Sequence, residues 1–98
     1  MSELSSKQRR QLKALAHGLS VSVQVGNAGI TEGVIESVEC ALAAHELIKV
    51  KVGQGSELDR KAGAAALAKA TNSQVATVIG RVWVLYRADL EDPQISLV

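Results

Sequence analysis

The chain has 98 residues, an apolar fraction of 47% and a single proline, which together indicate one small folded domain. Its lone cysteine, Cys40, excludes an internal disulfide, and no apolar run has the length of a membrane span or forms a secretory signal. We therefore expect a cytoplasmic protein. Because the formal net charge is only +1, binding to nucleic acid would require positive charge gathered on one surface.

The first predicted element is a helix that begins after Ser5 and stops before Gly18. Ser5 and Gln8 have the spacing of a capping box, and glycine is common just past a helix end. Helical periodicity places on one side Gln8, Leu12, Leu15 and Ala16. An adjacent arc collects Arg9, Arg10, Lys13 and His17. The helix should therefore have an apolar face and a basic face.

A strictly alternating valine run over residues 21–25 predicts a half-buried strand, which leads directly into Gly26-Asn27-Ala28-Gly29. This glycine loop is either a tight strand-to-helix connection or an anion site, since glycines permit close approach and a helix start offers free amides. An acidic residue in the first helical turn opposes an anion. No lysine follows the second glycine as it does in a P-loop, which disfavours nucleotide hydrolysis.

The helix after this loop should have Thr31 as its cap and extend over residues 32–45. Its predicted apolar side consists of Val34, Val38, Ala41 and Leu42, and the opposite, solvated side carries Glu32, Glu36 and Glu39. Residues 46–52 form the next predicted strand, with Ile48, Val50 and Val52 on one side and Leu47, Lys49 and Lys51 on the other.

A third helix is predicted over residues 57–71 with Ser56 as its cap, followed by a hairpin of residues 74–79 and 81–87 around Gly80. Residues 88–98 should be a loosely attached tail. The result is an α/β domain over residues 1–87, of order α-β-α-β-α-β-β, in which a mixed four-stranded sheet packs against helices. The predicted buried strand residues are Val21, Val23, Val25, Ile48, Val50, Val52, Val82 and Val84. A more polar sheet face should collect Ser22, Gln24, Lys49, Lys51, Arg81, Trp83 and Arg87.

The sequence nominates no catalytic residue, metal site or cofactor. The two histidines, His17 and His45, lie at predicted helix ends without an evident nucleophile or carboxylate partner. One cysteine and two distant histidines match no standard metal-ligand spacing. Three further features each have two interpretations at this point. The basic arc is either a solvated face or an RNA contact, and the same holds for the strand lysines Lys49 and Lys51. Trp83 is either a core residue or a platform on which a base stacks.

Taken together, these segments resemble a stand-alone CRM domain of the bacterial YhbY type. The resemblance rests on the Gly-x-x-Gly loop after the first strand, on "HELIKVKV", and on the closing "GRVWVLYR". It implies an RNA-binding domain akin to the C-terminal domain of bacterial translation initiation factor three. It also implies a KH-like loop that approaches the nucleic-acid backbone. More basic versions of this loop have Lys or Arg between the glycines, where this chain has Asn27 and Ala28.

Stand-alone bacterial members of this family are implicated in maturation of the large ribosomal subunit. The resemblance therefore implies a non-catalytic protein, most simply a monomer, that binds ribosomal RNA in large-subunit precursors and no membrane. The expected RNA-binding residues are Arg9, Arg10, Lys13, Gly26, Asn27, Ala28, Gly29, Lys49 and Lys51. The alternative is a protein-interaction module that docks through its exposed sheet face or sheet edge.

Overall fold

The computed structural model describes residues 4–53 and 60–98, and it contains the seven predicted elements in the predicted order. The helices are α1 (Ser6–Ala16), α2 (Glu32–Ala44) and α3 (Arg60–Ala70). The strands are β1 (Val21–Val25), β2 (Leu47–Val52), β3 (Gln74–Ile79) and β4 (Val82–Tyr86). The predicted capping residue Ser56 lies outside the described residues.

The helix caps form as the sequence predicts. Ser5 accepts a hydrogen bond from the Gln8 amide at 3.1 Å, and the Gln8 side chain accepts one from the Ser5 amide at 2.9 Å. This reciprocal pair satisfies two amides that the start of α1 would otherwise leave unpaired. Thr31 caps α2 in a similar way by accepting from the Val34 amide at 3.2 Å.

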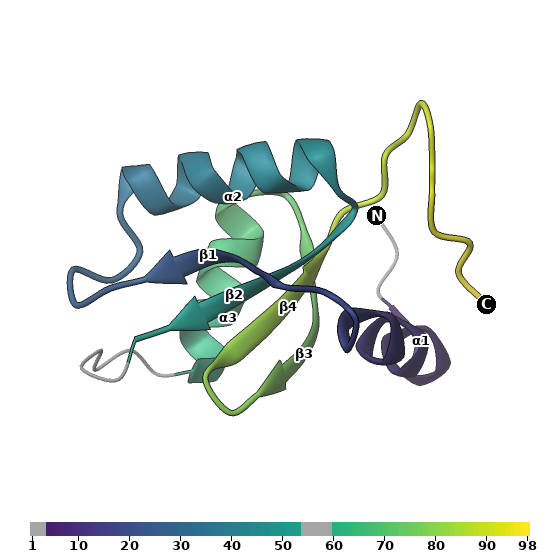
Figure 1. Cartoon of the computed structure of the whole chain (residues 1–98), viewed down its shortest axis with the longest axis horizontal. Helices are drawn as coiled ribbons and strands as arrows, with labels where there is room; N and C mark the ends of the chain where they lie inside the picture. Colours follow the sequence, from purple (N-terminus) through teal and green to yellow (C-terminus); the bar gives the residue numbers. More distant parts are fainter. Residues whose placement is uncertain (1–3, 54–59) are drawn as a thin grey trace.

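The four strands form one mixed sheet in the order β1-β2-β4-β3 (Figure 1). β1 is parallel to β2, whereas β4 is antiparallel to both β2 and β3. The predicted β3–β4 hairpin is thus confirmed, and Gly80 in its turn has a φ of +56°. Since β1 and β3 are the edge strands, the segments that follow them begin at opposite edges of the sheet.

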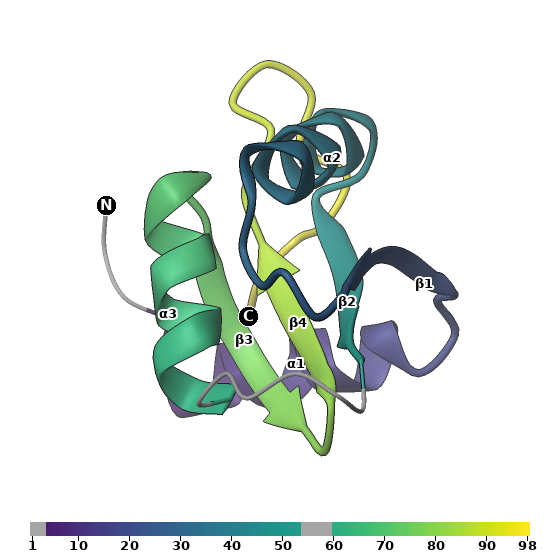
Figure 2. The same cartoon turned by 90° about the vertical axis from the view of Figure 1, so that its left-hand side faces the viewer.

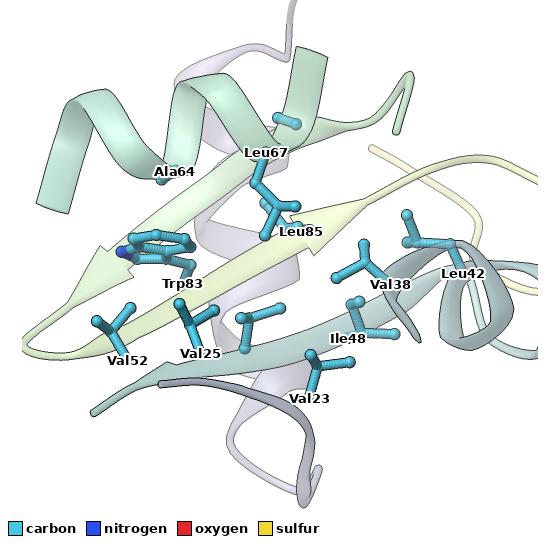
Figure 3. Packing of buried hydrophobic residues seen from close by; sticks show 12 residues of the cluster. Val23, Val25, Val38, Leu42, Ile48, Val52, Ala64, Leu67, Trp83 and Leu85 are labelled. Atoms are coloured by element: carbon cyan, nitrogen blue, oxygen red, sulfur yellow. The ribbon is translucent and has the colours of Figure 1, made fainter. Parts of the chain in front are cut away.

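One sheet face is covered by α2 and α3 and holds the larger core (Figure 3). The helices contribute Val38, Leu42, Ala64, Leu67 and Ala68, and the strands contribute Val23, Val25, Ile48, Val50, Val52, Trp83 and Leu85. The predicted burial of Val23 and Val50 is confirmed, with 7% and 0% of their surfaces exposed. The strand registers predicted for β1 and β2 are therefore correct, because a shift of one residue would have turned both outward.

The other face is partly covered by α1, which crosses it beneath the sheet in Figure 2. Leu12 and Ala16 of α1 pack against Leu47 of β2 and Val84 of β4. Leu47 is the first residue of β2 and Val84 is the middle residue of β4. Lys51, near the end of β2, is exposed. This face is therefore apolar beneath α1 and polar beyond it.

Two predicted burial assignments are wrong, and a third residue predicted to be buried, Val82, is only partly buried. Val21 is 38% exposed, because it begins an edge strand whose register shifts between Val21 and Val23. Trp83, expected on the polar face, is fully buried in the larger core, while Val84 lies beneath α1. The alternation within β4 thus faces the opposite way from the prediction. As an inner strand covered on both faces, β4 has large apolar residues on both sides, so its pattern does not indicate which side faces which helix.

The segment over residues 88–98, expected to be loosely attached, makes specific contacts with the domain. The buried carboxylate of Glu46 accepts hydrogen bonds from the amides of Asp89, Gln94 and Ile95 at 2.6–2.7 Å. The side chain of Gln11 in α1 donates to the Ser96 carbonyl at 2.7 Å. Because Glu46 immediately precedes β2, the tail is held beside the sheet and α1.

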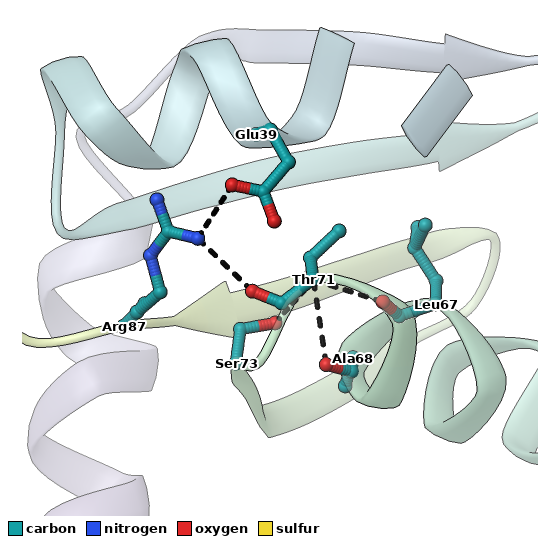
Figure 4. A network of polar contacts seen from close by, with 6 residues as sticks. All are labelled: Glu39, Leu67, Ala68, Thr71, Ser73 and Arg87. Carbon is teal, nitrogen blue, oxygen red and sulfur yellow. Dashed lines mark hydrogen bonds and ion pairs between the residues drawn. The ribbon is translucent and has the colours of Figure 1, made fainter. Parts of the chain in front are cut away.

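A polar network joins the middle of α2 to the residues that follow α3 and β4 (Figure 4). The Arg87 guanidinium, just past β4, donates to the Glu39 carboxylate of α2 at 2.8 Å and to the Thr71 carbonyl at 3.0 Å. The Thr71 hydroxyl in turn donates to the Leu67 carbonyl of α3 at 2.8 Å. Glu39, predicted to be one of a solvated row of carboxylates, is therefore half-buried and paired, whereas Glu32 and Glu36 are exposed.

Candidate nucleic-acid interface

The glycine loop is a tight turn at the end of β1. The Gly29 amide donates to the Gly26 carbonyl at 3.0 Å, and Gly29 has a φ of +76°, a left-handed conformation that strongly favours glycine. Gly26 has a different environment, since a Cβ added there would meet no atom within 4 Å. The first glycine therefore leaves open space beside the chain, and the second makes the turn possible.

The start of α2 presents unpaired amides next to this turn. Thr31 satisfies the Val34 amide, and within the part of the chain that the structure describes, the amides of Glu32 and Gly33 make no hydrogen bond. A helix N-terminus of this kind attracts anions through its amides and its dipole. The Glu32 side chain is exposed in the first turn and opposes such binding, so this loop depends on cations supplied by other elements.

The predicted basic arc of α1 lines a groove between α1, α3 and the edge strand β3, which we call the α1–β3 groove. Arg9, Arg10 and Lys13 are exposed on one wall, and Lys61 belongs to the α3 side. The floor is Val75–Val78 of β3, and the groove has a volume of about 590 Å³. No acidic residue is among its described lining residues, so this region concentrates positive charge in a chain whose net charge is only +1.

The glycine loop and the basic arc are not adjacent. The loop follows β1 at one edge of the sheet, and the groove lies along β3 at the other edge. Strands in a sheet are about 4.8 Å apart, so three strand intervals separate the two features by roughly 14 Å. Figure 1 agrees with this separation, since the turn after β1 and α1 lie at different ends of the molecule.

The two strand lysines have different surroundings. The Lys49 ammonium donates to the Leu19 carbonyl at 3.0 Å, in the segment between α1 and β1. Lys51, two residues further along β2, borders a pocket with Gln24, Val52, Gly53 and Arg81, which we call the sheet-end pocket. The structure thus separates two residues that the sequence treated alike.

Sequence reasoning did not select Gln24, Lys61 or Arg81 as binding residues. Lys61 precedes the apolar positions of α3, and nothing in its local sequence relates it to the basic arc of α1. Gln24 and Arg81 reach Lys51 only through strand pairing, because Gln24 lies opposite Lys51 and Arg81 precedes Val82, which lies opposite Lys51 on the other side. The one available signal was that the sequence pattern had placed Gln24, Lys51 and Arg81 on the same polar sheet face.

Trp83 has no surface available for base stacking. It is 0% exposed and packs among the larger core residues in Figure 3, so it belongs to the core. Within residues 4–53 and 60–98, there is no cluster of three or more His, Cys, Asp or Glu side chains that could hold a metal ion. No helix in these same ranges is long and apolar enough to cross a membrane.

Residues 4–87 match the CRS1 / YhbY (CRM) domain. The chain belongs to the CRM domain family. The matched residues extend from Leu4, two residues before α1 begins, to Arg87, so they include the glycine loop, the basic arc and all four strands.

Two bacterial relatives are similar over nearly their whole length. The Bacillus subtilis protein named "Probable RNA-binding protein YqeI" is 43% identical over 94 residues, covering 96% of this chain and 98% of the relative. A Haemophilus influenzae protein named "RNA-binding protein" is 41% identical over 97 residues, covering 99% of this chain and 97% of the relative. These names describe RNA-binding proteins and do not describe enzymes.

The fold of this CRM domain is also found in a solved structure. The solution structure of the Staphylococcus aureus protein SAV1595 matches with a TM-score of 0.85 and 40% sequence identity. The match covers 98% of this chain and 100% of the Staphylococcus protein. The architecture of three helices and a mixed four-stranded sheet is thus shared with a relative of nearly equal extent.

Proposed function

We propose that this CRM domain is a non-catalytic, cytoplasmic RNA-binding protein that binds ribosomal RNA in large-subunit precursors through the glycine loop and the basic first helix. The observation that carries the proposal is the segregation of charge. Arg9, Arg10 and Lys13 line a groove that has no acidic residue among its described lining residues, while Glu32 and Glu36 are exposed on α2. Cations gathered in this way neutralise phosphates, which provide most of the affinity in sequence-independent nucleic-acid binding.

The separation of the two surfaces favours a structured RNA as the ligand. A phosphate near Gly26 and phosphates in the α1–β3 groove must be presented roughly 14 Å apart, across the width of the sheet. Folded ribosomal RNA presents backbone segments in fixed relative positions, so it can contact both surfaces without the full entropic cost of ordering a flexible strand. The ribosomal assignment itself is supported by the family to which the chain belongs.

Crosslinking in cells followed by sequencing of the attached RNA tests this function. We expect predominant recovery of large-subunit ribosomal RNA precursors. Recovery of other RNAs would overturn the ribosomal assignment but not RNA binding, whereas recovery of no RNA would favour the protein-interaction module. A salt titration separates these two classes, because RNA binding should weaken steeply with salt and a mainly apolar protein interface should not.

A further inference from the structure

The sheet-end pocket lies where β1 and β2 end and the β3–β4 turn begins β4, and its described lining comes from these three segments. Gln24 of β1 pairs with Lys51 of β2, and Lys51 pairs with Val82, which follows Arg81. The Arg81 carbonyl accepts a hydrogen bond from the Val52 amide at 2.7 Å, which fixes the β3–β4 turn against the end of β2. The pocket has a volume of about 430 Å³, and none of its described lining residues belongs to the core cluster beneath α1.

This pocket adjoins the glycine loop. The Gly53 amide, at the pocket wall, donates to the Val25 carbonyl at 2.8 Å. A Cβ on Gly53 would lie 3.2 Å from that oxygen and 4.0 Å from the Gly26 Cα. Gly53 therefore lets β2 approach the first residue of the loop, and a ligand beside Gly26 would also be close to the pocket.

The charged groups of Lys51 and Arg81 are available to a ligand. Within the described part of the chain, neither side chain has a hydrogen bond or an ion pair, and no lining residue of the pocket is acidic. Two other cations on the sheet differ in this respect, since Lys49 is bonded to the Leu19 carbonyl and Arg87 to Glu39. Unneutralised cations beside an uncharged glycine loop suit a polyanion.

We propose that Lys51 and Arg81 form a phosphate-binding bridge that guides the RNA backbone from the glycine loop across the end of the sheet toward the α1–β3 groove. This inference rests on the proposed RNA-binding function. The strand order gives the path: the loop follows β1, Lys51 is on β2, Arg81 is in the β3–β4 turn, and the groove runs along β3.

The bridge recognises the sugar–phosphate backbone rather than the bases. Arg81 offers a planar fork of donors that suits two phosphate oxygens, while Lys51 offers a point charge. The Gln24 amide adds a neutral donor to the same pocket. No aromatic side chain lines the pocket, so its described lining residues provide no base-stacking surface.

The test compares Lys51→Gln/Arg81→Gln with two controls, using an oligouridine and an in vitro transcript of large-subunit ribosomal RNA as probes. Lys69→Gln removes one exposed positive charge from α3, and Lys69 does not line the pocket. Lys51→Arg/Arg81→Lys retains both charges. Fluorescence anisotropy over a salt series gives the affinity and the salt slope, and two-dimensional amide NMR spectra confirm that each variant is folded.

We expect Lys51→Gln/Arg81→Gln to bind on the order of tenfold more weakly, with a salt slope reduced by about 0.7 for each single-strand phosphate that is no longer neutralised. The charge-retaining variant should keep the wild-type slope, and Lys69→Gln should change it little. An unchanged slope in Lys51→Gln/Arg81→Gln, or an equal loss of affinity in Lys69→Gln, would overturn the bridge while leaving RNA binding intact. If the wild-type protein bound neither the oligouridine nor the transcript, the proposed function and the bridge would both be overturned.

Discussion

Glu46 is the residue that connects the C-terminal segment to the domain. Glu46 is 5% exposed, and its carboxylate accepts three backbone hydrogen bonds from residues 89–95. In Glu46→Gln, an amide NH₂ replaces one acceptor oxygen and faces these donors, so at least one amide loses its partner. We expect the free energy of unfolding to fall by about 2 kcal/mol, as measured by urea denaturation, and carboxypeptidase to digest the tail faster. The exposed Glu36→Gln on α2 is the control, and an equal loss of stability there would contradict this role.

Tyr86 gives the fold a pH dependence in the alkaline range. Burial raises the pKa of its phenol above the usual 10.0, and the nearby Glu46 carboxylate raises this pKa further. The folded protein therefore holds the phenolic proton more tightly than the unfolded chain does. The stabilisation is complete below pH 10 and is lost as the pH rises through the folded-state pKa. In denaturation series that extend from below pH 10 upward, the stability of the wild type relative to Tyr86→Phe should fall as the pH rises. A difference in stability that does not change with pH would contradict this role of Tyr86.

At the scale of elements, the two glycines of the loop should respond differently to the same substitution. Gly29→Val places a β-branched residue at a φ of +76°, which costs at least 1–2 kcal/mol of stability, about the cost of a left-handed residue. Gly26→Val adds its side chain to open space, so stability should change by less than about 1 kcal/mol while phosphate approach is hindered. RNA affinity and urea denaturation of both variants test this. Wild-type affinity in Gly26→Val would mean that the loop is only a turn.

The elements themselves were predictable because they depend on local chemistry. The capping box at Ser5, the cap at Thr31 and the short connection around Gly80 are each contained within a few residues. The sequence did not predict which side chains of β4 point to which sheet face, because an inner strand buried on both sides has no alternation of polar and apolar residues. The association of Lys51 with Arg81 was also hidden, since it depends on the pairing of β2 with β4 rather than with β3.

At the scale of the whole molecule, the sheet acts as a spacer between the glycine loop and the α1–β3 groove. The two surfaces lie at opposite edges of a four-stranded sheet, and the described residues surround it in a domain with a radius of gyration of 12.5 Å. The core beneath α2 and α3 joins β1, β2 and β4 into one packed unit. Because packed interiors deform little, the distance between the two surfaces should stay nearly constant when RNA binds.

This rigid spacing makes the effects of substitutions at the two surfaces additive. Gly26→Val and the triple variant Arg9→Ala/Arg10→Ala/Lys13→Ala alter features roughly 14 Å apart. If one ribosomal RNA transcript binds to both surfaces, the decreases in binding free energy in the two variants should sum in the combined variant to within about 0.5 kcal/mol. The triple variant should also reduce the salt slope. If the RNA helix behaves like B-DNA, the reduction should be about 0.9 for each duplex phosphate that is no longer neutralised. Gly26→Val removes no charge, so it should leave the salt slope nearly unchanged. Anisotropy titrations of the four proteins measure both quantities. A combined variant that binds no more weakly than the triple variant would mean that the glycine loop and the groove do not hold the same RNA molecule.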